Sequence, residues 1–80
     1  MSWNHRLMKM KDGEDDFYQF HEVFYDKEGN VESYTKNGVT VGGKDIGEVK
    51  WVLLEMLAAL DKPVLDYEDG IYKFNKQKYN

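Results

Sequence analysis

The sequence predicts an α+β domain in which an antiparallel three-stranded β-meander is packed by one α-helix. Two observations carry this prediction. The first half of the chain holds three strand-like segments separated by turns, and the second half holds one segment of helical periodicity. Eighty residues supply one hydrophobic core, so residues 1–80 are expected to form a single domain.

The three strands are expected at about residues 3–11, 17–26 and 31–36. The first segment alternates between its two sides and stops at the turn sequence Asp12-Gly13. The second is dense in aromatic residues and valine, which favour strands. Gly29 is placed to take a positive φ in the turn before the third strand. These features predict the meander.

The helix is expected at about residues 45–61. Asp45, followed three residues later by Glu48, resembles a capping box, and Pro63 prevents the helix from continuing. One apolar stripe at helical spacing is expected to lie on the sheet. This stripe contains Ile46, Val49, Leu53, Met56, Leu57 and Leu60.

A second apolar flank of the same helix is expected at Trp51, Leu54 and Ala58, about 100° or more from that stripe. A solvated helix back does not normally hold tryptophan and leucine together. We therefore predict that these three residues form the interface of a homodimer.

A C-terminal extension is expected at residues 64–80, and its first part, 64–67, is predicted to add a short fourth strand at an edge. The expected element order is β-β-β-α-β. Residues 70–80 interleave lysine with aromatic residues. This composition is typical of single-stranded nucleic acid binding, but lysine is also common on edge strands, and we favour the edge strand.

The net charge of −4 is distributed unevenly. Residues 12–70 hold all fifteen acidic residues and five basic ones, a net charge of −10, whereas both ends of the chain are basic. An acidic body repels phosphate, so direct binding of nucleic acid is not expected. The lack of cysteine, with no recognisable signal peptide or membrane span, predicts a cytoplasmic protein without a membrane partner.

Acidic residues gather in the first turn and near the last predicted strand. An acidic surface can imitate a phosphate backbone and attract a basic groove, and solvated loop charge is the alternative. The predicted partner-binding residues are Glu14, Asp15, Asp16, Asp66, Glu68 and Asp69.

Residues 38–44 match the pattern G-x-x-x-x-G-K of phosphate-binding loops. The next residue is Asp45, where such loops need Ser or Thr to hold Mg²⁺, and an acid there would oppose phosphate. We therefore interpret the segment as a flexible connector followed by a helix cap. Lys44 is the residue that a nucleotide-binding alternative would need.

His5 and His21 are expected on neighbouring strands, close to Glu22. Two imidazoles without a third ligand do not make a zinc site, so we expect no metal and no cofactor. Glu22 could serve as a general base, yet no nucleophile pattern accompanies it. Enzymatic activity is not expected, and a small hydrolase or nucleotide binder built on these residues and Lys44 is the third hypothesis.

Three segments resemble a set of small bacterial and phage proteins of unassigned function. They are Trp3-Asn4-His5-Arg6, His21–Asp26 with Gly29, and Leu57–Asp66. In size and acidity the chain is similar to phage-encoded anti-CRISPR proteins, and in its meander followed by a helix it resembles antitoxin domains of HicB type. These resemblances imply a non-catalytic protein-binding inhibitor that occupies a basic surface of a nucleic-acid-handling complex. The alternative they imply is an antitoxin domain that masks a toxin.

Overall fold

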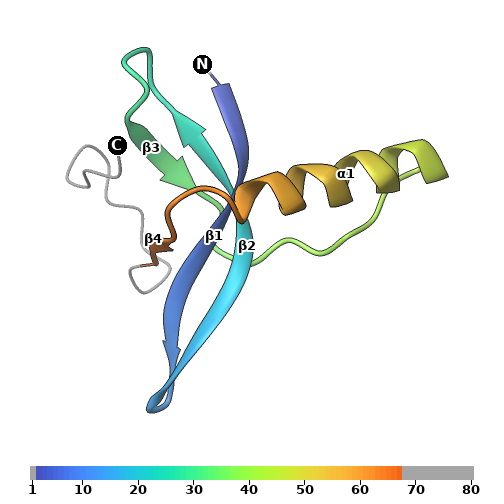
Figure 1. Cartoon of the computed structure of the whole chain (residues 1–80). Coiled ribbons are helices and arrows are strands. Elements are labelled where there is room, and N and C mark those ends of the chain that lie inside the picture. Colours follow the sequence, from blue (N-terminus) through green and yellow to red (C-terminus); the bar gives the residue numbers. More distant parts are fainter. Residues whose placement is uncertain (1, 68–80) are drawn as a thin grey trace.

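The computed structural model describes residues 2–67. In chain order its elements are β1 (Ser2–Asp12), β2 (Asp15–Tyr25), β3 (Val31–Tyr34), α1 (Ile46–Ala59) and β4 (Leu65–Asp66) (Figure 1). Within these residues the strands form one four-stranded sheet in the order β3-β2-β1-β4. The predicted α+β class is confirmed, and the elements follow one another along the chain as predicted.

β1, β2 and β3 form the predicted antiparallel meander, but the sheet as a whole is not antiparallel. β4 pairs with β1 in parallel, with Leu65 opposite Met8 and Asp66 opposite Lys9. The chain leaves the sheet after β3, passes through α1 and returns beside β1, at the opposite edge. Parallel pairing requires a long crossover of this kind. The sheet is therefore mixed.

The hairpin of β1 and β2 is longer than predicted, because strand pairing continues until Asp12 lies opposite Asp15. A two-residue turn joins the strands, and Gly13 takes a φ of 68° in it. Glycine adopts this left-handed conformation without steric cost, which suits the tight turns of hairpins. The far half of the hairpin projects from the rest of the molecule (Figure 1).

β3 ends at Tyr34, two residues earlier than predicted. The turn before it follows the prediction, because Gly29 takes a φ of 87°. In the same turn the Asp26 carboxylate accepts hydrogen bonds from two backbone N–H groups, those of Glu28 and Asn30, each at 2.9 Å. Such Asx-type bonds hold a turn without help from the strands.

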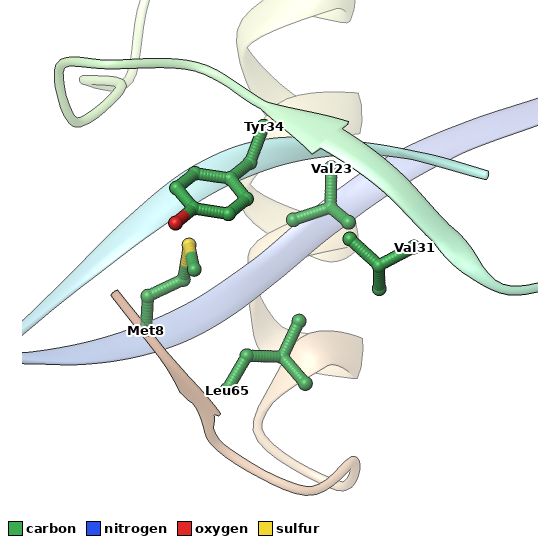
Figure 2. Packing of buried hydrophobic residues seen from close by; sticks show 5 residues of the cluster. All are labelled: Met8, Val23, Val31, Tyr34 and Leu65. Atoms are coloured by element: carbon green, nitrogen blue, oxygen red, sulfur yellow. The ribbon is translucent and has the colours of Figure 1, made fainter. Parts of the chain in front are cut away.

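Buried apolar side chains from β1, β2, β3 and β4 form one cluster on a single face of the sheet (Figure 2). The cluster contains Met8, Val23, Val31, Tyr34 and Leu65. Side chains alternate across a strand, so Met8 and His5 lie on opposite faces of β1. The His5 ring lies beside Trp51 of α1, which places the helix on the face opposite Met8. The sheet therefore encloses its main core without the helix, with β3 and β4 both contributing to it.

α1 packs on the other face of the sheet through smaller side chains than predicted. Met56 and Ala59 are buried there, and Val49 and Val52 are half-buried. The predicted stripe is wrong at four positions, which are exposed: Ile46, Leu53, Leu57 and Leu60. Helical periodicity alone did not select the contact face, because this helix is apolar on most sides. Within residues 2–67, no helix has the length and apolar character needed to cross a membrane.

Candidate interaction surface on the helix

The outer side of α1 exposes large apolar side chains that a solvated helix seldom carries. Ile46 is 87% exposed and Leu57 is 63% exposed. The other exposed apolar residues of this region are Trp51, Leu53, Leu54, Leu60 and Val64. Contiguous apolar patches larger than a few hundred Å² are rare on monomeric proteins and mark interaction sites. The outer side of α1 is therefore the first candidate for a functional surface.

An open apolar groove of about 500 Å³ adjoins this surface. It lies between α1 and the connection that leads from β3 to α1. The residues that make it apolar are Phe20, Val39, Val41, Leu53, Met56, Leu57 and Leu60. An apolar concave site of several hundred Å³ is large enough to receive side chains of a bound molecule.

The groove wall formed by the β3–α1 connection is fixed to β2. The backbone N–H of Val39 donates to the carbonyl oxygen of Phe20 at 2.9 Å, and the Gln19 side-chain amide donates to the Val39 carbonyl at 3.0 Å. Gly38 lies so close to Gln19 that an added Cβ would collide with its side chain. The glycine is thus explained by close packing in this wall. These contacts hold the wall of the groove in place.

α1 has few polar positions to place toward water. Its charged residues are Glu48, Lys50 and Glu55, and the other eleven of its fourteen residues are apolar or glycine. A helix that is apolar all round is normally buried in a larger core or assembly. In residues 2–67 the sheet covers one side of α1, and the remaining apolar sides are exposed.

The predicted dimer residues occupy two different environments. The Trp51 ring lies 6.3 Å, between centroids, from both the Trp3 ring and the His5 ring, in edge-on geometry, although Trp51 is still 47% exposed. Trp51 therefore helps to attach α1 to β1. Leu54 and Ala58 are exposed and face away from the sheet.

The predicted acidic surface is divided between two places. Glu14, Asp15 and Asp16 lie at the tip of the β1–β2 hairpin. Of these three residues, Asp16 forms an ion pair with Lys11, at 3.0 Å. The hydrogen bond and charge of the Lys11 ammonium lower the pKa of the Asp16 carboxyl. Lys11 thus partly offsets the charge of Asp16, and Asp12, Glu14 and Asp15 carry the remaining negative charge of the tip.

Asp66 lies in β4 at the register position of Lys9, three residues of β1 before Asp12. Three residues of strand span about 10 Å, so Asp66 is at the same end of the sheet as the hairpin tip without joining it. Glu68 and Asp69 lie outside the described residues, as does the stretch 70–80. The structure therefore places four of the six predicted partner-binding residues.

Two carboxylates occupy the N-terminus of α1. The Asp45 carboxylate accepts the backbone N–H of Glu48 at 2.8 Å, and the Glu48 carboxylate accepts the backbone N–H of Lys44 at 2.6 Å. Asp45 caps the helix as predicted, whereas the Glu48 carboxylate accepts from Lys44 and not from the N-cap residue Asp45, so half of the predicted capping box forms. A phosphate bound at this helix end would need these backbone N–H groups, but two carboxylates already accept them. The negative charge of the carboxylates would also repel the phosphate, which disfavours the nucleotide-binding alternative.

His5 and His21 point to opposite faces of the sheet, because they lie one position apart in the hairpin register and side chains alternate. His5 is paired with Glu22, and His21 with Arg6. No group of three potential metal ligands occurs within residues 2–67. The two imidazoles therefore cannot bind one ion together.

His21 is a buried part of the sheet. Its Nδ1 donates to the carbonyl oxygen of Thr35 at 3.0 Å, which assigns the proton to Nδ1, and its ring lies 5.2 Å from that of Tyr67. Burial lowers the pKa of His21, and the hydrogen bond to Thr35 opposes this effect without cancelling it. The folded state therefore favours the neutral imidazole.

Acidification should destabilise the protein through His21. The unfolded chain takes up a proton near the ordinary pKa of 6.5, whereas the folded chain takes it up only at lower pH. The contribution of neutral His21 to the free energy of unfolding is therefore complete above pH 6.5 and is lost as the pH falls through the lowered pKa of the folded state. Urea unfolding at about pH 7.5 and about pH 5 should show a smaller loss of stability in His21→Gln than in the wild type. An equal loss in both proteins would contradict this role of His21.

Sequence reasoning missed Leu53, Leu57 and Leu60 as surface residues and assigned them to the core. The signal that could have identified them is the composition of α1, which holds more apolar side chains than one sheet face can cover. Val39 and Val41, which complete the groove, gave no sequence signal of their own because they lie in a connection without regular structure.

Residues 2–67 form a small α+β domain whose helix is covered by the sheet on one side and exposes apolar side chains on the others. Comparison of the chain with protein-family models, with curated protein sequences and with solved structures gave no match.

Proposed function

We propose that this domain is a non-catalytic protein-binding module whose contact surface is the outer side of α1 together with the adjoining groove. The observation that carries the proposal is the row of Leu53, Leu57 and Leu60, each more than half exposed beside a groove that the fold holds open. Covering three half-exposed leucines would contribute roughly 3 kcal/mol to binding. A protein surface is the partner that offers apolar side chains at matching spacing.

The acidic tip of the hairpin supplies a second surface for the same function. Glu14 and Asp15 lie at the end of a projecting two-stranded ribbon, where they can reach a basic patch on a partner (Figure 1). Charges at the edge of an interface mainly increase the association rate and select the partner, whereas buried apolar residues supply affinity. We therefore assign affinity to α1 and selection of a basic partner, such as a nucleic-acid-handling complex, to the tip.

Capture of partners from a lysate of the natural host tests this proposal. Leu57→Glu should reduce recovery of specific partners on the order of 100-fold, because it removes a central apolar contact and adds a charge that the interface would bury. Asp15→Lys should weaken capture less and make it more dependent on salt. Lys27→Glu, in the exposed β2–β3 turn, is the matched control for a charge change away from both surfaces.

Circular dichroism would establish that each variant is folded. If Leu57→Glu is folded and captures the same proteins as the wild type, the helix is not the contact surface and the proposal is wrong. If only Asp15→Lys loses the partner, the acidic tip provides the affinity, and the assignment of roles between the two surfaces must be reversed.

A further inference from the structure

We infer that the exposed side of α1 is covered by the same side of a second copy of this chain, in an antiparallel helix pair. This inference rests on the proposed function: it names a second copy of the chain as the protein that covers the helix surface, and it leaves the acidic tips of both copies for a basic partner. Its starting point is one row of residues on α1. The row consists of Ile46, Lys50, Leu53, Leu57 and Leu60, at alternating intervals of four and three residues.

Intervals of four and three residues are those of the contact positions in helix pairs. All five residues of the row are exposed in the single chain. The row also borders the groove, because Leu53, Leu57 and Leu60 belong to both. Leucines of one copy can therefore insert beside those of the other, as knobs insert into holes.

The exposed apolar area is sufficient for a dimer. Four residues of the row and Val41 beside it are exposed by 44% to 87% of their surface, which corresponds to roughly 100 Å² each. Two copies would thus bury about 1,000 Å² of apolar surface, which is the size that a specific interface needs. A two-fold pair uses the same patch on both chains, so one apolar row is enough.

Charge selects the antiparallel orientation. Lys50 is the charged residue of the row, and in a parallel pair it would face its own copy. With Leu53 opposite the partner's Leu57, Lys50 lies next to the partner's Asp61. Asp61 follows the C-cap residue Leu60, and the last turn of α1 contains no basic residue. The carboxylate and the negative end of the helix dipole would both stabilise the ammonium group.

This row replaces the flank that the sequence predicted for the dimer. Trp51 is used within the chain, where its ring packs against those of Trp3 and His5. Leu57 has no comparable role in the described part of the chain and is more exposed than Trp51. The dimer surface is therefore expected about one third of a turn away from Trp51, on the groove side of α1.

Analytical ultracentrifugation of the full chain between about 2 and 200 µM tests the inference through a charge exchange. The wild type should dimerise, and Leu57→Glu should be monomeric. Lys50→Glu and Asp61→Lys should each raise the dissociation constant about tenfold, because each places like charges together twice in a symmetric dimer. The double variant Lys50→Glu/Asp61→Lys should return to within about threefold of the wild type. Lys27→Glu should leave the dimer unchanged.

A wild-type monomer at about 200 µM would overturn the inference. The proposed function would then still stand if Leu57→Glu lost capture of other proteins, so the two failures are distinguishable. A dimer that Lys50→Glu weakens but Asp61→Lys does not, with no recovery in the double variant, would overturn the antiparallel arrangement.

Discussion

Replacing Leu65 by alanine should lower the free energy of unfolding by about 2–5 kcal/mol, a large part of the stability of a domain this small. Leu65 is 1% exposed and packs in the main core with Met8 and Tyr34 (Figure 2). β4 is two residues long, and Leu65 is its buried residue. The substitution would therefore open a cavity and also loosen the strand that closes the sheet edge beside β1.

Leu54→Ala is the matched control, because it removes the same atoms from a residue that is 54% exposed. Its expected effect is below about 0.5 kcal/mol, since alanine also suits a helix well. Urea unfolding at about 2 µM protein, where a weak dimer contributes little, measures both variants. Equal stability of the two variants would mean that β4 does not close the core.

Replacing Arg6 by alanine should cost about 2–3 kcal/mol of unfolding free energy. The buried guanidinium donates to the Pro63 carbonyl at 2.7 Å and to the Tyr25 hydroxyl at 3.0 Å. The Tyr25 hydroxyl in turn donates to the Asn4 side chain at 2.7 Å. Arg6 thus ties β1 to β2 and to the segment that joins α1 to β4. Its loss would leave the Pro63 carbonyl without this donor.

Arg6→Lys separates the effect of the positive charge from that of the two guanidinium hydrogen bonds. Lysine retains the charge and most of the apolar stem, but it lacks the planar fork that reaches two acceptors. Its stability should fall between those of the wild type and Arg6→Ala in thermal unfolding. If Arg6→Ala were as stable as the wild type, the cost of burying the guanidinium would equal the gain from its hydrogen bonds.

Local signals in the sequence predicted the elements well, because local chemistry determines them. Glycine with positive φ marks the turn at Gly29, Asp45 caps α1 as predicted, and Pro63 follows its end. The partner of β4 was not predictable in this way. Pairing of Leu65 with Met8 depends on the path of the chain through α1, which no short segment encodes.

The excess of apolar residues on the helix could be predicted from the sequence, but the side chains that the fold exposes most could not. An excess of apolar residues on the helix was visible in the sequence, and it predicted an interaction surface at Trp51, Leu54 and Ala58. The larger uncovered surface lies at Leu53 and Leu57 instead. Two helix sides with similar apolar content compete for the sheet, and contacts such as the Trp51–Trp3 ring pair decide between them. Those contacts exist only in the folded chain.

The parallel pairing of β4 with β1 has a consequence for synthesis of the protein. Leu65 follows its neighbour Met8 by 57 positions along the chain. At 5–20 residues per second, a ribosome needs roughly 3–11 s to make that stretch. The β1–β2 hairpin is complete once Tyr25 has been made, so for the last 40 of these positions its core-facing side still lacks Leu65. Pauses in translation between Val31 and Leu65 should therefore leave the apolar face of the hairpin exposed to other nascent chains. Faster codons in this stretch should increase the yield of soluble protein.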